Sequence, residues 1–192
     1  MQRLNSVQPE NAEARAKELL DTVQQAFGTV PNAAKVMANS PAVLQSFLGF
    51  STAMGEARIG EKLHNQIKLN TSENNECEYC TSILSAVAPT AGLSAEEVLV
   101  GRTGLAEDTR IKAALTFAND VLETRGKVTD DQLASVKSAG FDDGQIVEVV
   151  ASVVLGCFTN FLNNVADTQL DVPPAEAIEP SAACSSGACS VH

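Results

Sequence analysis

Residues 60–87, GEKLHNQIKLNTSENNECEYCTSILSAV, decide the fold because they join two helices at a pair of cysteines. Apolar residues recur at helical spacing in both halves, so we predict helices from about Gly60 to Asn74 and from about Cys77 to Val87. Asn74-Asn75-Glu76 forms the break between them. The motif Cys77-x-x-Cys80 therefore lies at the start of the second helix.

Helical periodicity continues on both sides of this stretch, whereas the alternating, β-branched runs typical of strands are scarce. Ser94-x-x-Glu97 has the pattern of a capping box at a helix start. Further helices are predicted at residues 9–27, 31–39, 41–54, 108–125, 129–139 and 142–165. We therefore expect an all-α fold, with a single domain over residues 1–172 and an irregular tail at residues 173–192.

Composition limits the partners. A chain of 192 residues with 44% hydrophobic residues can bury one sizeable core. Its net charge of −11 repels nucleic acid and anionic membranes, so we expect neither as a partner. No apolar run approaches the eighteen or so residues needed to cross a bilayer, and the polar N-terminus lacks the apolar centre of a signal peptide. These features predict a cytoplasmic protein.

The cysteine pair is the main candidate for chemistry. Two cysteines three positions apart can form a disulfide, and the free N–H groups of a helix start favour the thiolate. Zinc would need further ligands, and His64, Cys157 and the tail cysteines form no second standard pair with suitable spacing. A redox role is therefore favoured over half a zinc site and over incidental structural cysteines, and we expect no metal or cofactor.

The text around the motif resembles a known family. Five stretches match it in order and spacing: Val30-Pro31-Asn32, Ser40 to Leu44, Asn75 to Ser82, Ala91 to Ser94, and Thr159 to Thr168. Over roughly residues 9–173 the chain resembles the alkylhydroperoxidase D-like branch of the carboxymuconolactone decarboxylase superfamily. The resemblance implies an all-helical homotrimer or homohexamer that reduces hydroperoxides and is re-reduced by a partner protein. It also implies that Cys80 attacks and that Cys77 resolves.

Three positions depart from the family pattern. The family usually has a glutamate twelve residues before the first cysteine, a histidine four after the second, and often a histidine in the final helix. Asn65, Leu84 and Asn164 stand at these positions, and none of them titrates near neutral pH. Because a proton relay contributes roughly 10²–10⁴ in rate, we predict weakened peroxidase activity.

The altered positions also suggest a different use. Lys68 stands where the family has a small or apolar residue, and Glu76 stands where it has a glycine. The alternative function is therefore a ligand-binding or engineered scaffold with a rebuilt pocket lined by Asn65, Lys68, Leu84 and Asn164. A desolvated Lys68 amine could form a Schiff base with a carbonyl substrate. The blander interpretation places Lys68 in solvent.

Other polar and sulfur groups receive simpler interpretations. Surface roles are expected for His64 and Glu61, and a buried, inert position for Cys157. Cys184 and Cys189 could form a local disulfide, bind a soft metal with His192, or pass electrons to the core pair. An exposed tail without a fixed role is the expected alternative.

Overall fold

The computed structural model describes residues 2–178, and all regular structure in that part of the chain is helical. The all-α prediction is therefore confirmed. Two short 3-10 helices, η1 (Pro9–Asn11) and η2 (Ala88–Ala91), accompany the α-helices. These are α1 (Ala14–Phe27), α2 (Asn32–Met37), α3 (Pro41–Met54), α4 (Glu61–Asn74), α5 (Glu78–Val87), α6 (Ala95–Thr103), α7 (Thr109–Thr124), α8 (Asp130–Ser138) and α9 (Asp143–Ala166).

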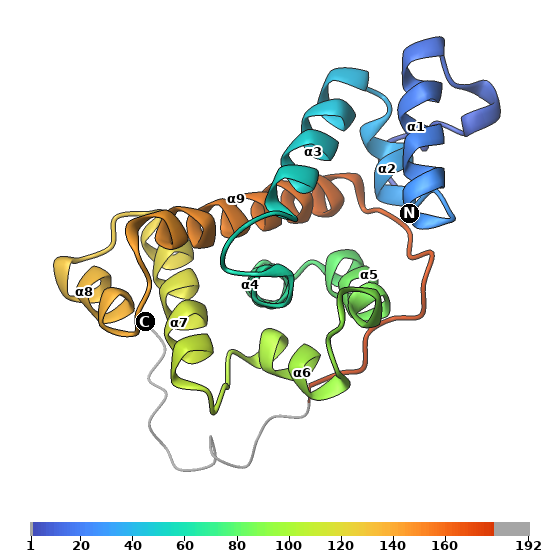
Figure 1. Ribbon diagram of the computed structural model, residues 1–192. Helices are drawn as coiled ribbons and strands as arrows, with labels where there is room; N and C mark the ends of the chain where they lie inside the picture. Colours follow the sequence, from blue (N-terminus) through green and yellow to red (C-terminus); the bar gives the residue numbers. More distant parts are fainter. Residues whose placement is uncertain (1, 179–192) are drawn as a thin grey trace.

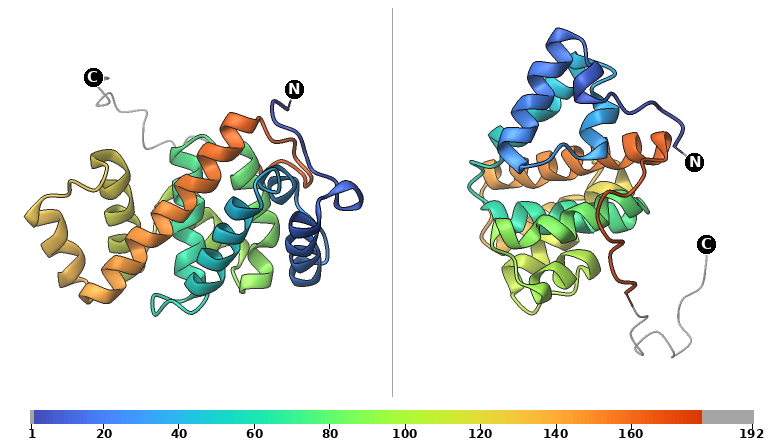
Figure 2. Two further views of the ribbon diagram at one scale, coloured as in Figure 1. Left: turned by 90° about the horizontal axis from the view of Figure 1, so that it is seen from above. Right: turned by 90° about the vertical axis from the view of Figure 1, so that its right-hand side faces the viewer.

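The long helix α9 lies between two groups of helices (Figure 1). Helices α1, α2 and α3 cover one side of it, and α4, α5 and α6 lie on the other side, as the right-hand view of Figure 2 also shows. Helix α4 packs against α9 and also contacts α5, α6 and α7. The two helices α4 and α9 therefore form the centre of the molecule.

Two separate apolar clusters stabilise these groups. The larger one joins α4, α7, α8 and α9 through buried residues that include Ile67, Leu115, Val136 and Val149. The other joins α1, α2 and α3 around Leu20 and Leu44, and Leu162 of α9 packs against it. Because α9 contributes to both clusters, it connects the two halves of the fold.

Helix ends follow the sequence signals in most places. The predicted capping box is present, since Ser94 Oγ accepts from Glu97 N and the Glu97 carboxylate accepts from Ser94 N. Equivalent boxes start α8 at Thr129 and α9 at Asp142. Such caps stabilise a protein by about 1 kcal/mol each.

The first predicted helix was wrong at its start. Residues 9–27 were expected to form one helix, but Ala12 and Glu13 are extended and separate η1 from α1. Ala12 packs against the cluster of α1, α2 and α3.

One sequence expectation about membranes needs correction. Helix α9 is long and apolar enough, by length and composition, to cross a bilayer. A single helix of this kind is weak evidence, because the core helix of a soluble protein passes the same test. Here one face of α9 packs against α2, α3, α4, α5 and α7, while several large apolar side chains on it are exposed.

Candidate functional site

Cys77 and Cys80 form a disulfide at the start of α5, with their Cα atoms 5.3 Å apart. The turn from α4 positions them, because Cys77 N donates to Ser72 O at 2.9 Å and Glu76 adopts a left-handed backbone with φ 50°. Cys77 is the N-cap of α5, and its Sγ accepts the backbone N–H of Cys80 at 3.3 Å. The helix start therefore favours negative charge on Cys77.

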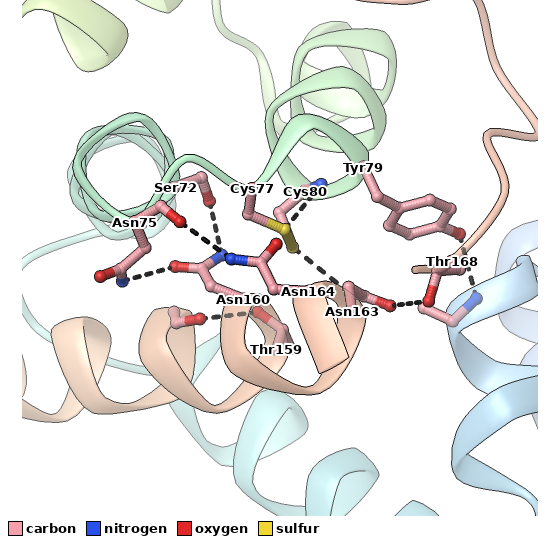
Figure 3. The surroundings of a disulfide bond; sticks show 12 residues. Ser72, Asn75, Cys77, Tyr79, Cys80, Thr159, Asn160, Asn163, Asn164 and Thr168 are labelled. Carbon is pink, nitrogen blue, oxygen red and sulfur yellow. Dashed lines mark hydrogen bonds between the residues drawn. A yellow bond between two sulfur atoms is a disulfide. The ribbon is translucent and has the colours of Figure 1, made fainter. Parts of the chain in front are cut away.

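Cys80 has a different partner, on α9. Asn163 Nδ2 donates to Cys80 Sγ at 3.3 Å, and Thr168 Oγ1 donates to Asn163 Oδ1 at 2.8 Å (Figure 3). The hydrogen bond from Thr168 fixes the orientation of the Asn163 amide. Its oxygen faces Thr168, and its N–H therefore faces the sulfur of Cys80. All three side chains are buried.

A second set of amides holds the loop before Cys77 against α9. Asn75 Nδ2 donates to Asn160 Oδ1 at 3.0 Å, and Asn160 Nδ2 donates to Ser72 Oγ at 3.0 Å. Asn164 Nδ2 donates to the backbone oxygen of Asn75 at 2.9 Å (Figure 3). These groups are neutral at all ordinary pH values, so they fix geometry and carry no titratable proton.

Tyr79 attaches the cysteine helix to two other parts of the chain. Its hydroxyl accepts from Ala33 N at 3.1 Å and donates to Asp171 at 3.4 Å. Burial is the main cause that raises the pKa of Tyr79, and the nearby Asp171 carboxylate raises it further. The phenol therefore stays neutral and acts as a hydrogen-bonding bridge between α5, α2 and the stretch after α9.

A cavity of about 310 Å³ lies beside Cys77. Arg102 forms an ion pair with Glu73 at its wall, and Glu76 and Glu78 add further negative charge. Cys77 is the member of the disulfide that lines this cavity. The full lining comprises Ser72, Glu73, Glu76, Cys77, Glu78, Thr81, Ser82, Arg102 and Ala175. Its acidic character disfavours anionic ligands.

None of the four predicted pocket residues lines this cavity. Asn65 Nδ2 donates to Glu61 O on its own helix, and Leu84 packs against the apolar cluster of Leu69, Ala88 and Leu93. Asn164 is exposed and contacts the backbone of Asn75. Their role as relay or pocket positions stays a prediction.

His64 is buried, so the expected surface role was wrong. It lies where α4 faces α9, and its Nδ1 is 2.8 Å from Ser152 Oγ. Because Ser152 Oγ donates to Glu148 O, the ring nitrogen of His64 donates to Ser152. Burial, followed by the charge of Lys68, lowers the pKa of His64 to about 4.

Lys68 lies one helical turn from His64 and is partly exposed. Burial lowers the pKa of the Lys68 amine to about 8, and the Glu61 carboxylate opposes this change. Within residues 2–178, no carboxylate forms an ion pair with this amine. The amine is therefore partly neutral near physiological pH, which the alternative function requires.

Sequence reasoning missed Asn163, Asn160 and Thr168. The signal was the helical phase of α9, in which Val149, Val153, Gly156, Asn160 and Asn163 all face inward at spacings of three or four. This phase places Asn163 against the cysteines and turns the neighbouring Asn164 outward. Tyr79 and Ser82 were also missed, since their partners, Asp171 and Ala175, belong to the irregular stretch after α9.

Of the remaining cysteines, only Cys157 lies within the described residues. Cys157 is partly buried and free, accepts from Asn75 Nδ2 at 3.5 Å, and has a pKa raised by burial. It is thus a poor nucleophile near neutral pH, as expected for an inert thiol. Cys184, Cys189 and His192 lie outside the described residues.

Comparison with known proteins rests on structure. No protein-family model and no curated protein matches the chain. A peroxidase-related protein from Ralstonia eutropha JMP134 with an alkylhydroperoxidase AhpD core has a TM-score of 0.77 and 20% identity, covering 88% of this chain and 92% of its own. A peroxidase-related protein from Silicibacter sp. TM1040 has a TM-score of 0.75 and 19% identity, covering 86% and 88%.

A third similar structure belongs to a debrominase. It is a cysteine-to-alanine variant of the debrominase Bmp8 in complex with 2,3,4-tribromopyrrole, with a TM-score of 0.74 and 19% identity, covering 88% of this chain and 91% of its own. The three similarities extend over most of each chain and share one arrangement of helices. The chain therefore has the same all-helical fold as these structures, the first of which is described as an alkylhydroperoxidase AhpD core.

Proposed function

We propose that the protein is a slow thiol peroxidase that reduces small hydroperoxides with the dithiol form of Cys77 and Cys80. The Cys80 thiolate attacks the terminal oxygen of the hydroperoxide, the O–O bond breaks, and an alkoxide leaves and takes a proton from water. Cys77 then attacks the sulfenic acid of Cys80, and hydroxide leaves with a proton as water. One alcohol, one water and the Cys77–Cys80 disulfide are the products.

The observation that carries this proposal is the contact between Asn163 Nδ2 and Cys80 Sγ. A fixed N–H donor stabilises a thiolate, as does the helix start at Cys77. No carboxylate or imidazole of residues 2–178 is hydrogen-bonded to either sulfur. The leaving alkoxide must therefore be protonated by water, which makes the reaction slow.

The test is hydroperoxide consumption by the dithiothreitol-reduced protein. We expect slow turnover that Cys80→Ser abolishes and that the double variant Asn65→Glu, Leu84→His accelerates. A parent and double variant that both leave the hydroperoxide untouched would exclude a peroxidase. Because Bmp8 is a debrominase, a brominated pyrrole serves as the second substrate in the same assay.

A second candidate function is amine chemistry at Lys68 on a carbonyl ligand. It is supported by the partly buried Lys68 amine, whose pKa is about 8 and which has no ion-pair partner within residues 2–178. A neutral amine attacks a carbonyl and forms an imine with loss of water. Borohydride trapping with a small aldehyde, read by mass spectrometry at Lys68, distinguishes this function from peroxide reduction. Modification spread over surface lysines would exclude it.

We also propose that the protein is a homotrimer or homohexamer and acts in the cytoplasm, where an external dithiol protein can regenerate it. Several large apolar side chains of α9 are exposed at helical spacing: Val147, Val154, Phe158, Phe161 and Val165. Contiguous exposed apolar surface of this kind is typical of a protein interface. Light scattering of the parent and of Phe161→Glu tests the oligomer, and a parent of monomer mass would exclude it.

A further inference from the structure

The stretch after α9 passes the cavity beside Cys77. Ala175 N donates to Ser82 Oγ at 3.0 Å, and Arg102 Nη1 donates to Glu176 O at 2.7 Å. Ala175 lines the cavity together with Cys77. These two hydrogen bonds hold the backbone at the cavity only two residues before the described chain ends at residue 178.

The disulfide itself has little access to a folded reductant. Cys77 and Cys80 are 1% and 3% exposed, and thiol–disulfide exchange needs a thiolate to reach one of the two sulfurs. The cavity of about 310 Å³ leads to Cys77 and has room for a few small side chains. An extended segment of small residues fits this opening better than the surface of a globular protein does.

The sequence beyond residue 178 has this composition. Residues 180–190, PSAACSSGACS, carry only small, uncharged side chains and include Cys184 and Cys189. Glu73, Glu76 and Glu78 at the cavity do not repel an uncharged segment whose cysteines enter as protonated thiols and lose a proton only as they attack Cys77. Among the possible reductants, the chain's own C-terminal residues are therefore small enough to enter the cavity and are not repelled by its charge.

The length of the chain also permits the contact. Cys184 follows Ala175 by nine residues, so an extended chain spans up to about 30 Å and a flexible one roughly 17 Å on average. Tethering at this length gives an effective thiol concentration on the order of millimolar. A free protein reductant in the micromolar range has to compete with that value.

We propose that Cys184 and Cys189 form an internal dithiol that enters this cavity and reduces the Cys77–Cys80 disulfide. The proposal rests on the proposed function for its purpose, which is to return the core pair to the dithiol form after each turnover. It adds a second redox site to the protein, the C-terminal cysteine pair. The external dithiol protein then reduces this pair and not the core disulfide.

The electrons balance in two exchanges. A thiolate of Cys184 or Cys189 attacks Cys77 Sγ, the core S–S bond breaks, and the Cys80 thiolate leaves toward the N–H of Asn163. The second tail thiolate then attacks the tail sulfur of the mixed disulfide, and Cys77 leaves. Two electrons and two protons have moved to the core pair, and the Cys184–Cys189 disulfide is reduced by an external dithiol, which is itself oxidised to a disulfide.

Trapping tests the first exchange. In full chains with Cys80→Ser, Cys157→Ser and either Cys184→Ser or Cys189→Ser, mild oxidation should join Cys77 to the remaining tail cysteine within one polypeptide, identified by non-reducing peptide mapping of the monomer band. Cys77 left free, or joined only to other molecules, would overturn the proposal.

Reduction kinetics test the complete cycle in the otherwise unchanged protein. With a thioredoxin-type dithiol protein as donor, the double variant Cys184→Ser, Cys189→Ser should regain core thiols at least about ten-fold more slowly than the parent. Cys157→Ser is the matched control and should keep the parent rate. Equal rates in the parent and the double variant would overturn the proposal.

A further assay separates this proposal from the peroxidase proposal. Pre-reduced double variant should consume one equivalent of hydroperoxide at the parent rate, because the tail cysteines take no part in that half-reaction. If neither protein consumes hydroperoxide, peroxidase function fails, while the exchange rates still decide the role of Cys184 and Cys189.

Discussion

Helices α4 and α9 meet in two regions of opposite chemical character. At the end where α5 begins, the side of the Cys77–Cys80 disulfide that faces α9 contacts neutral amides and hydroxyls, among them Asn163 and Thr168. Further along the same interface lie His64 and Lys68, whose pKa values are both lowered by burial. Neither His64 nor Lys68 is hydrogen-bonded to a sulfur, so these two groups are not placed to exchange protons with the thiols. The carboxylates near Cys77 are those of Glu73, Glu76 and Glu78 at the cavity.

The largest expected effect concerns the titratable region and Lys68. With a pKa of about 8, the amine is neutral at pH 7 on the order of a hundred times more often than an ordinary lysine. Its labelling rate by a soluble amine reagent should therefore rise with pH around a midpoint near 8, measured by peptide mapping. Lys62, which forms an ion pair with Glu97, is the comparison residue. If the labelling rates of Lys68 and Lys62 depend on pH in the same way, the pKa of Lys68 is not lowered and the two regions do not differ as described.

His64 makes the same region sensitive to acid. Its pKa is about 4 in the folded chain and about 6.5 when unfolded, so between these values the unfolded chain binds more protons. The free energy of unfolding should fall as the pH drops from about 6.5 to 4, by about 3 kcal/mol. Urea denaturation of His64→Gln should show a smaller loss of unfolding free energy in this window. If His64→Gln loses as much unfolding free energy between about pH 6.5 and 4 as the parent does, His64 is not the group responsible.

The cysteine region is tested by Asn163. Removing its N–H with Asn163→Leu takes away a hydrogen bond to a charged sulfur, which is worth about 2 kcal/mol. The pKa of Cys80 should rise and hydroperoxide consumption should fall by roughly ten-fold or more, measured by stopped-flow alkylation and peroxide assay. Asn164→Leu is the comparison variant because Asn164 also holds the loop before Cys77, through the backbone of Asn75, but has no hydrogen bond to either sulfur. If the comparison variant loses as much activity as Asn163→Leu, the contact with sulfur is not what matters.

The smallest expected effect comes from Glu76, which precedes the disulfide with a left-handed backbone. Glycine adopts φ of 50° without the strain of a Cβ, so Glu76→Gly should raise the free energy of unfolding by about 1 kcal/mol. The substitution also removes one negative charge from the cavity, which should slightly lower the pKa of the Cys77 thiol. Glu78→Gln changes the charge without changing the backbone and separates the two effects. A loss of stability in Glu76→Gly would contradict the strain argument.

Much of the fold followed from the sequence because it depends on local patterns. Helical spacing and the Ser94 capping box predicted most helices, and the Cys77-x-x-Cys80 spacing predicted the disulfide position. The site was harder, because its contacts join residues far apart in the chain. Asn163 and Cys80 are 83 residues apart, and only the phase of α9 indicates that Asn163 faces inward.

His64 shows a second reason why the site resists prediction. Average preferences place histidine near the surface, but α4 is covered by α9 on one side and by α6 and α7 on others, so most of its circumference is buried. The partner of His64 is Ser152, which a sequence pattern does not identify. Burial that comes from several neighbouring helices is a property of the whole fold.

The way α9 ends has an electrochemical consequence. Asp167 turns the chain into the left-handed region, and Thr168 then donates back to Asn163, whose amide N–H faces Cys80. An N–H that stabilises the thiolate stabilises the reduced pair relative to the disulfide, which raises the reduction potential. Each 1.4 kcal/mol of such stabilisation corresponds to about 30 mV in a two-electron couple. Thr168, which follows the C-cap residue of α9, thereby influences the reduction potential of the Cys77–Cys80 pair through Asn163.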